Sequence, residues 1–253
     1  MKDDGFDKTR QYWNFMANSA GQAAAIDPND CCGFKNAYIS LCHHLALFPV
    51  LNRLQESALV LDLGCGTGVF LASFRSVRPD IFGVGVDLSE AMLTEAVRLH
   101  PQLAGQVMAY DGYRLPFADG SVDALTCTGV LLYIHENSRL LAMANEFRRL
   151  LKPGGWVVAV EQVRRKTHLQ PEHHKVQRTP EQLVALFTQS GLVLQEWRQI
   201  RRGHFPLVYG IRYGWIPTRF HAAVARLEAR LWRDASVPLL DYADALFIWR
   251  LPG

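Results

Sequence analysis

The chain has 253 residues, of which 49% are hydrophobic and 20% are charged, and its formal net charge is +3. Its size and apolar content support one globular domain with an ample core and exclude a disordered chain. No apolar run approaches the roughly 20 residues that span a membrane, and the first residues lack the basic-then-apolar pattern of a secretory signal, so we expect a cytoplasmic protein.

The amino-terminal part is predicted to combine a polar, turn-rich entry with a helix. Residues 25–38 contain many turn-forming and polar side chains, and residues 36–54 are predicted to be helical. Pro49 should break or kink that helix, because proline lacks the backbone N–H that a helix interior needs. A polar loop of this kind often binds a ligand, although it would equally serve to cap the helix.

Residues 60–68 form an apolar run that ends in alternating glycines. Gly64, Gly66 and Gly68 leave no Cβ between the backbone and a ligand, and they permit the positive φ of a tight turn from strand to helix. A buried parallel strand followed by such a turn is typical of proteins that bind a nucleotide-shaped ligand.

Residues 81–87 are predicted to form a second buried strand that ends in a carboxylate. Asp87 lies about 20 residues beyond the glycine turn, where a carboxylate accepts hydrogen bonds from both hydroxyls of a ribose. Ser89 is placed to cap the helix that follows. The two strands together therefore predict a ribose-containing ligand at their carboxyl ends.

The order of the glycines separates two families. A dinucleotide-binding turn reads Gly-x-Gly-x-x-Gly, whereas this chain has Asp62-x-Gly64-x-Gly66-x-Gly68. This pattern resembles the class I S-adenosylmethionine (SAM)-dependent methyltransferases. In that family the acidic residue and the glycine backbone hold the amino-acid end of the cofactor.

Three further segments carry the same resemblance. Residues 110–117 resemble the adenine-contact segment of the family, residues 121–127 its fourth strand, and residues 146–155 the helix and turn before its fifth strand. The resemblance runs roughly from Ala58 to Glu161. It is nearest to the small-molecule methyltransferases typified by ubiquinone and menaquinone biosynthesis.

The resemblance implies an α/β fold with a doubly wound, Rossmann-like sheet of seven mostly parallel strands. The last two strands, expected at residues 192–200 and 245–251, form an antiparallel pair at one edge in this family. We accordingly expect three regions within a single domain: an amino-terminal helical lid at residues 1–57, a SAM-binding core at residues 58–201, and at residues 202–253 a helical insertion followed by the last strand.

The resemblance also implies SAM as the cofactor and assigns a set of residues to it. These are Asp62, Gly64, Cys65, Gly66, Gly68, Asp87, Leu88, Asp111, Gly112 and Thr128.

Methyl transfer needs chiefly the alignment of the acceptor and the exclusion of water, because the sulfonium already activates the methyl group. The acceptor should lie at the carboxyl ends of the strands, so Tyr133, His135 and Glu161 are candidate catalytic residues. The family often has a histidine where Tyr133 stands. That histidine is not carried over to this chain. His135, two positions further on, is the best single candidate for a general base, since histidine titrates near neutral pH. In the alternative, His135 is an ordinary surface residue, Tyr133 only packs in the wall of the site, and Glu161 simply ends its strand.

Candidate acceptor contacts come from the lid and from a basic loop. In the family the amino-terminal segment folds over cofactor and acceptor, which makes Tyr12, Lys35 and Asn36 candidate acceptor-binding residues. His174 lies in the loop of residues 164–178, whose five Lys and Arg side chains would suit a phosphate. A solvated linker is the alternative for this loop.

The insertion at residues 202–244 is expected to cover the acceptor side. From residue 162 onward the chain has 14 Lys and Arg against 7 Asp and Glu, whereas the preceding residues have 13 against 17. The basic carboxyl-terminal third favours an anionic acceptor or an anionic surface.

A helix with two adjacent stripes is predicted at residues 217–234. The apolar stripe is Phe220, Val224, Leu227 and Leu231, and the basic stripe is Arg219, Arg226, Arg230 and Arg233. With the aromatic residues just upstream, residues 205–234 would suit the surface of an anionic membrane. In the alternative, the apolar stripe packs on its own domain while the arginine stems cover the rim.

The sequence predicts no metal site and no nucleic-acid partner. The five cysteines lack paired metal-ligand spacing, and the chain shows no nucleic-acid recognition module. We expect methyl transfer to a small-molecule acceptor, first of all an oxygen of a saccharide, including one carried on a lipid or phosphate. One alternative is carbon methylation of a lipid quinone, which predicts an apolar pocket where the first hypothesis predicts convergent polar groups. Another is a noncatalytic SAM-binding module.

Overall fold

The computed structural model describes residues 5–20, 26–27, 29–30, 32–171, 174–238 and 241–253. Residues 1–4, 21–25, 28 and 31 of the expected lid lie outside the described residues. The helices are α1 (Gly5–Ala20), α2 (Phe34–Leu51), α3 (Val69–Val77), α4 (Glu90–Leu99), α5 (Asn137–Leu150), α6 (Pro180–Gln189), α7 (Pro206–Arg212) and α8 (His221–Trp232). The strands are β1 (Leu59–Leu63), β2 (Phe82–Asp87), β3 (Val107–Ala109), β4 (Val122–Thr128), β5 (Leu151–Val163), β6 (His168–Gln170), β7 (Lys175–Gln177), β8 (Val193–Arg202) and β9 (Ala243–Arg250).

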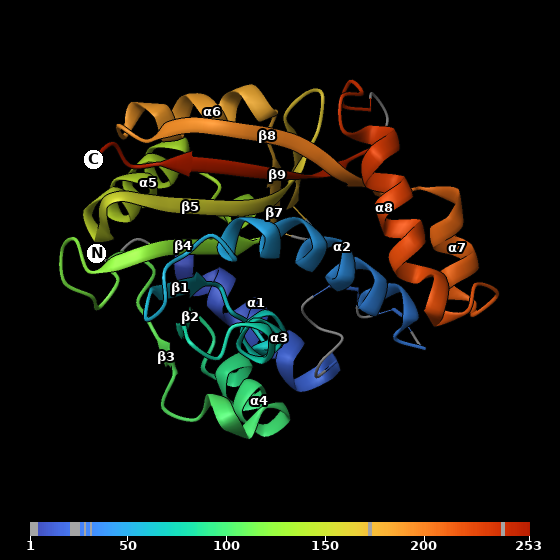
Figure 1. Cartoon of the computed structure of the whole chain (residues 1–253), viewed down its shortest axis with the longest axis horizontal. Coiled ribbons are helices and arrows are strands. Elements are labelled where there is room, and N and C mark those ends of the chain that lie inside the picture. The colour runs from blue at the N-terminus through green and yellow to red at the C-terminus, as the bar shows by residue number, and fades with distance from the viewer. Residues whose placement is uncertain (1–4, 21–25, 28, 31, 172–173, 239–240) are drawn as a thin grey trace.

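Seven strands form one sheet in the order β3-β2-β1-β4-β5-β9-β8 (Figure 1). Strands β1 to β5 pair in parallel, and β9 pairs antiparallel with both β5 and β8. The predicted seven-stranded, mostly parallel sheet is therefore confirmed. The strand order reverses between β1 and β4, and sheets of this kind bind ligands at the carboxyl ends of the strands next to such a reversal.

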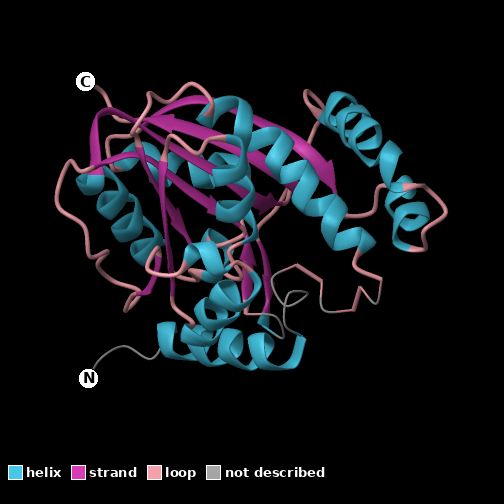
Figure 2. Cartoon of the chain, turned by 60° about the horizontal axis from the view of Figure 1, so that its bottom comes forward, coloured by secondary structure: helices cyan, strands magenta, loops and turns pink. Residues whose placement is uncertain are grey.

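Helices cover both faces of the sheet (Figure 2). On one face α5 and α6 bury Phe147 and Phe187, and Phe187 stacks on Trp249 of β9 with ring centroids 4.3 Å apart. On the other face α2 and α3 bury Leu47 and Phe74. Successive strand side chains point to opposite faces, so the same strands supply both cores.

The helix predicted at residues 36–54 is α2, which begins two residues earlier. Pro49 lies in its last turn, and the helix ends at Leu51, three residues before the predicted end. The division of the chain into a lid, a core and an insertion stays a prediction.

The insertion between β8 and β9 contains α7 and α8, which lie together at one end of the molecule (Figure 1). The buried residues of α8 are His221, Ala225 and Glu228. Glu228 is held in place because its carboxylate accepts hydrogen bonds from the hydroxyl of Tyr38 and from the backbone N–H of Arg202, both at 2.7 Å. This rotation of α8 leaves most of its apolar stripe exposed.

Candidate functional site

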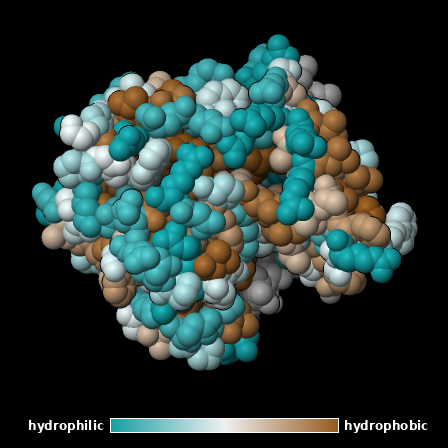
Figure 3. All heavy atoms as spheres, viewed as in Figure 1, coloured by the Kyte–Doolittle hydropathy of each residue, from teal (hydrophilic) through white to brown (hydrophobic). Residues whose placement is uncertain are grey.

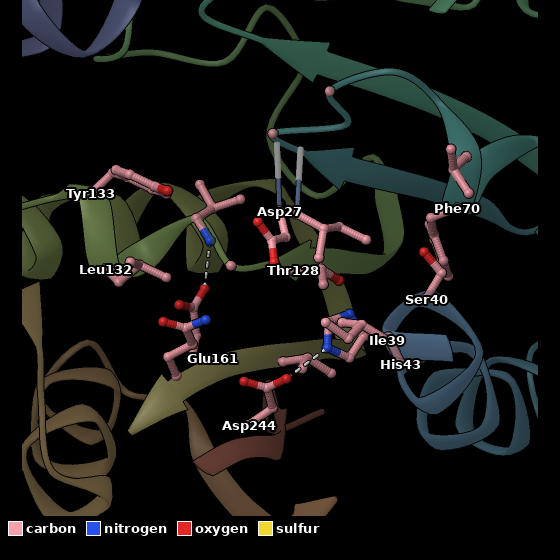
Figure 4. Close-up of a pocket in the computed structure, with 18 of the residues that line it drawn as sticks. Asp27, Ile39, Ser40, His43, Phe70, Thr128, Leu132, Tyr133, Glu161 and Asp244 are labelled. Atoms are coloured by element: carbon pink, nitrogen blue, oxygen red, sulfur yellow. Dashed lines mark hydrogen bonds and ion pairs between the residues drawn. The ribbon is translucent and has the colours of Figure 1, made fainter. Parts of the chain in front are cut away.

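A cavity of about 1080 Å³ lies at the carboxyl edge of the sheet. Its wall is formed by the glycine turn after β1, the ends of β2, β4 and β5, the start of β9, strand β7 and one side of α2. Strand β9 runs antiparallel to β5, so its first residues reach the same edge as the last residues of the parallel strands. Figure 4 shows part of this wall.

The glycine turn is tight because side chains press against it. Gly64 has a φ of 67°, and a Cβ on it would lie 2.4 Å from Cγ2 of Val130. Gly66 also has a positive φ, and its backbone N–H donates to Oδ2 of Asp87 at 2.9 Å. Only glycine adopts this turn without strain, and the turn brings the backbone to the cavity wall.

Asp62 is a fully buried carboxylate at the start of this turn. Thr126 Oγ1 donates to Asp62 Oδ1 at 2.8 Å, and no ion pair joins Asp62 to a cationic side chain within the described part of the chain. Burial raises the pKa of Asp62 to about 7, although the Thr126 hydrogen bond opposes this. A cationic group placed here would favour the ionised form, which makes Asp62 suited to a ligand ammonium.

Asp87 lies at the end of β2, and its two oxygens bind the glycine turn and the start of α4. Oδ2 accepts from Gly66 N–H, and Oδ1 accepts from Ser89 N–H at 2.8 Å. Burial raises its pKa, while these backbone hydrogen bonds act in the opposite direction. A carboxylate has about four acceptor positions, so Asp87 retains capacity for the two hydroxyls of a ribose. Beside it the wall turns apolar with Leu88, Met92 and Tyr110, which suits a flat ring.

Seven of the ten predicted cofactor residues line the cavity. They are Asp62, Gly64, Cys65, Gly66, Asp87, Leu88 and Thr128. The structure does not bring Gly68, Asp111 and Gly112 to the wall. Gly68 is the N-cap of α3, and a Cβ on it would lie 2.6 Å from Leu103 Cδ1. Gly112 lies under the ring of Phe6, and exposed Asp111 closes a turn by accepting from two following backbone N–H groups.

Glu161 and Tyr133 are the predicted catalytic residues that do line the cavity. Glu161 Oε1 accepts from the backbone N–H groups of Val130 and Leu131 at 2.9 and 2.8 Å. Burial raises the pKa of Glu161 to about 7 against the effect of these hydrogen bonds. The Tyr133 ring packs edge-on against Trp13 at 5.1 Å, so it forms part of the wall.

His135 does not line the cavity. It is exposed, and its Nε2 lies 2.9 Å from the carbonyl oxygen of His174. The ring of His174 in turn packs on Tyr12 at 5.5 Å, and neither of these two residues reaches the cavity wall. The structure therefore gathers His135, His174 and Tyr12 into a cluster outside the cavity and gives no support to His135 as the base.

Lys35 and Asn36, the other predicted acceptor contacts, line the cavity. Lys35 Nζ lies 2.6 Å from Asp27 Oδ2, and Asn36 Nδ2 donates to the carbonyl oxygen of Asp27 at 2.9 Å. The backbone N–H of Asn36 donates to Asp30 Oδ2 at 2.8 Å. These contacts fix the start of α2 against the polar entry, so the entry both caps the helix and forms cavity wall.

A row of polar side chains crosses the sheet face that α2 covers. One residue comes from each of five adjacent strands, in the order Asp62, Thr128, Gln162, Asp244 and Arg201. Two residues toward the amino ends of β1 and β5, and at the paired position of β9, the same face is apolar at Val60, Val160 and Leu246, which belong to the core under α2. All five side chains of this row, which we call the polar row, line the cavity.

His43 of α2 meets the far end of the polar row. Its Nε2 lies 3.1 Å from Asp244 Oδ2 (Figure 4). Arg201 Nη1 donates to the same oxygen at 2.7 Å. Burial would raise the pKa of Asp244, but Arg201 and His43 outweigh it and lower the value to about 2. This pair could not be predicted from the sequence, because 201 positions separate its members.

Five oxygen atoms in the cavity wall are buried and have no hydrogen-bond partner among the described residues. They are Asp30 Oδ1, Asn36 Oδ1, Thr128 Oγ1, Glu161 Oε2 and Asp244 Oδ1. An unsatisfied buried polar atom costs about 1–3 kcal/mol. A ligand with several O–H or N–H donors would satisfy them.

Comparison with known proteins assigns the core. A family described as "Methyltransferase domain" matches residues 60–155. These residues hold the glycine turn, both acidic strand ends and the start of β5. The chain carries a class I SAM-dependent methyltransferase domain. Demethylmenaquinone methyltransferase of Beutenbergia cavernae is 40% identical to this chain over 102 residues, which are 40% of the chain and 40% of that protein.

Two further similarities extend beyond the methyltransferase domain. A Micromonospora griseorubida protein, provisionally named a 23S rRNA (guanine-N(1)-)-methyltransferase, is 31% identical over 182 residues, which are 68% of this chain and 57% of that protein. Geranyl diphosphate C-methyltransferase of Streptomyces coelicolor superposes with a TM-score of 0.65 over 98% of both chains at 16% identity, which shows a shared fold. The chain spans less than two thirds of the length of the curated relatives from Beutenbergia cavernae and Micromonospora griseorubida.

The cavity wall beside the methyltransferase domain fits SAM. Asp62 suits the ammonium group of the methionine part, Asp87 suits the ribose, and the apolar wall beside Leu88 and Met92 suits the adenine. No group of three or more His, Cys, Asp or Glu residues that would hold a metal ion occurs within the described ranges.

Proposed function

We propose that the protein transfers the methyl group of SAM to an oxygen of a hydroxyl-bearing small molecule, such as a saccharide free or carried on a lipid or phosphate. The supporting observation is the set of five unpaired oxygen atoms in the cavity wall. Most of them only accept hydrogen bonds, so they select a ligand rich in donors, and hydroxyl groups are such donors. SAM supplies a methyl group that its positive sulfonium already activates.

Basic side chains around the acceptor end support an anionic group on the same molecule. Lys175 of β7 lines the cavity and lies 5.7 Å above the ring of Tyr133. Burial lowers its pKa, while Asp244 and Asp27 raise it. Arg164 also lines the cavity and donates to Gln177. A phosphate or carboxylate on the acceptor would pair with these two cations.

Carbon methylation of a lipid quinone is the alternative that the similarity to demethylmenaquinone methyltransferase favours. A quinone ring needs an apolar slot, and the cavity does contain Ile39, Phe70 and Leu132. The polar row and the unpaired oxygens weigh against this acceptor, because an apolar ring would leave them buried without partners.

Label transfer from methyl-labelled SAM into extract of the native cells tests the proposal. The extract is divided into organic-soluble, water-soluble small-molecule, polysaccharide and nucleic-acid fractions. We expect label in the water-soluble small-molecule or polysaccharide fraction, or in a lipid-linked glycan of the organic-soluble fraction. Label in a quinone-type lipid would favour the alternative, label in nucleic acid would overturn both, and tight SAM binding without transfer would indicate a noncatalytic module.

The affinity for SAM should fall as the pH is lowered through about 7. The pKa of Asp62 is raised to about 7, and only its ionised form pairs with the ligand ammonium. Protonation should weaken binding about tenfold between pH 8 and pH 6. Isothermal titration calorimetry at several pH values measures this. An affinity that is flat across this interval would show that Asp62 does not pair with the ligand.

We also propose that the exposed apolar face of α7 and α8 contacts an anionic membrane. Apolar residues gather over these helices, with hydrophilic residues beside them (Figure 3). The exposed apolar and aromatic side chains are Leu207, Tyr209, Tyr213, Trp215, Phe220, Leu227 and Leu231. Exposed arginines of the basic stripe lie beside them on α8. Aromatic side chains next to arginines match the interface of a bilayer that contains anionic lipid. No helix in the described ranges is long and apolar enough to span a bilayer.

Vesicle flotation tests this contact. The double variant Arg226→Ala/Arg230→Ala should bind vesicles containing phosphatidylglycerol about 30-fold more weakly than the unmodified protein, because each arginine near the surface contributes about 1 kcal/mol. The matched control Arg165→Ala/Lys166→Ala removes the same charge from an exposed loop elsewhere. An equal loss in both double variants, or no binding by the unmodified protein, would refute the contact.

A further inference from the structure

We propose that His43, oriented by Asp244, is the general base that removes the proton from the acceptor hydroxyl. This inference rests on the proposed function, since only a protonated nucleophile such as a hydroxyl needs a base. It assigns the catalytic proton transfer to α2 and β9, outside the part of the chain that matches the methyltransferase family.

The environment of His43 fixes its tautomer. Asp244 is ionised at neutral pH, because Arg201 and His43 hold its pKa at about 2 against the effect of burial. A carboxylate can only accept hydrogen bonds, so the Nε2 of His43 at 3.1 Å from Asp244 Oδ2 must carry the proton. In the neutral ring, Nδ1 then keeps its lone pair. This is the arrangement in which a carboxylate orients a histidine base.

Asp244 is itself held rigidly, so it can orient the ring. Arg201 Nη1 donates to the same oxygen at 2.7 Å, and the side chains of Arg201 and Asp244 are only 1% and 3% exposed. His43 is 15% exposed and lines the cavity, so its ring reaches a ligand while its partner does not face bulk solvent. The remaining charged groups near Asp244 are Lys175 and Glu228.

The polar row relates His43 to the cofactor. Asp62, which suits the ammonium of SAM, and Asp244 lie on the same sheet face, three strands apart. They are also offset by four residues along the strands, so at about 4.8 Å per strand and about 3.3 Å per residue their Cα atoms are about 19 Å apart. This span accommodates the methionine end of SAM and an acceptor in line with it. His43 then lies on the acceptor side of the reacting atoms.

The proton and electron balance is complete with these groups. The acceptor oxygen forms a bond to the methyl carbon, and the carbon–sulfur bond breaks with its electron pair staying on sulfur. S-adenosylhomocysteine therefore leaves as a neutral thioether. The hydroxyl proton passes to Nδ1 of His43, and the imidazolium that forms is stabilised by the carboxylate of Asp244. The proton is later released to solvent.

The variant His43→Gln tests the base. With the labelled-SAM assay and the extract fraction that accepts label, we expect a loss of transfer of at least about 100-fold. SAM affinity, measured by calorimetry, should stay within about twofold, since His43 lies at the other end of the polar row. In His43→Ala, added imidazole should restore part of the activity. His168→Gln, an exposed histidine outside the cavity wall, is the matched control.

Three results would overturn the inference: transfer by His43→Gln close to that of the unmodified protein, a loss that runs parallel to a loss of SAM affinity, or a loss confined to His135→Gln or Glu161→Gln.

A second measurement does not depend on activity. Nitrogen-15 NMR of the histidine rings, assigned with His43→Gln, should show Nε2 protonated and Nδ1 bare in the neutral ring, and the opposite tautomer would refute the dyad. If the unmodified protein labels no fraction, the proposed function fails, and the NMR result still decides the tautomer of His43.

Discussion

Replacing Asp62 by asparagine should weaken SAM binding about 100-fold and leave the fold intact. Removing one partner of a buried charged hydrogen bond costs about 3 kcal/mol of binding energy, and every 1.4 kcal/mol is about tenfold in affinity. Asparagine keeps the volume of the side chain and an oxygen that can accept from Thr126, so the local packing is preserved. Calorimetry with SAM and with S-adenosylhomocysteine measures the change, because both ligands carry the ammonium group.

The same variant separates binding from stability. The folded-state pKa of Asp62 is about 7, above its ordinary value of 3.8, so the ionised carboxylate is disfavoured in the fold. This group therefore contributes most to stability at low pH, and that contribution is lost as the pH rises from about 4 to about 7. At pH 8 the free energy of unfolding of Asp62→Asn should be at least that of the unmodified protein. Asp234→Asn, an exposed carboxylate outside the cavity, should change neither quantity. Unchanged SAM affinity in Asp62→Asn would refute the placement of the ammonium group.

Replacing Asp244 by alanine should destabilise the protein by about 3–5 kcal/mol. The substitution leaves the guanidinium of Arg201, which is only 1% exposed, without its counter-charge, and an uncompensated buried charge costs energy of this order. The folded-state pKa of Asp244 is lowered to about 2. The stability it provides is therefore present above pH 4 and is lost as the pH falls toward 2.

Urea unfolding at pH 7 measures this effect against a matched ion pair. Asp119 pairs with Arg149 at 2.5 Å, but its side chain is 75% exposed, so Asp119→Ala should cost less than about 1 kcal/mol. Equal losses in Asp244→Ala and Asp119→Ala would contradict the structural role of the Arg201–Asp244 pair. Because Asp244 supports the fold, His43→Gln is the cleaner probe of the base.

The core of the fold could be predicted from the sequence because its signals are local. The glycine turn lies between β1 and α3, and Asp87 and the capping Ser89 lie between β2 and α4, so each signal falls within one strand–turn–helix unit. Ser89 Oγ does accept from the backbone N–H of Met92. Strand order then follows from the family pattern. The predicted cofactor contacts at Asp111 and Gly112 depended on that pattern alone. The side chain of Phe6, from α1, covers Gly112 in this chain.

The acceptor side could not be predicted in the same way, because its contacts join distant segments. His135 was the more obvious base by position in the chain, but it is exposed just before α5, while His43 meets Asp244 only after α2 docks on the sheet. Which face of α8 is buried could not be predicted from the sequence either. Glu228 is fully buried although glutamate is usually exposed, since Tyr38 and Arg202 satisfy its carboxylate and so turn the apolar stripe outward.

The position of the transferred methyl group tests the central claim most directly. We would incubate the protein with SAM carrying a carbon-13 methyl group and the extract fraction that accepts label, purify the product and record its NMR spectrum. We predict that the labelled methyl carbon is bonded to oxygen, on a molecule with further hydroxyl groups. A labelled methyl group bonded to a ring carbon of a quinone-type lipid would contradict the assignment of the polar cavity to a hydroxyl acceptor.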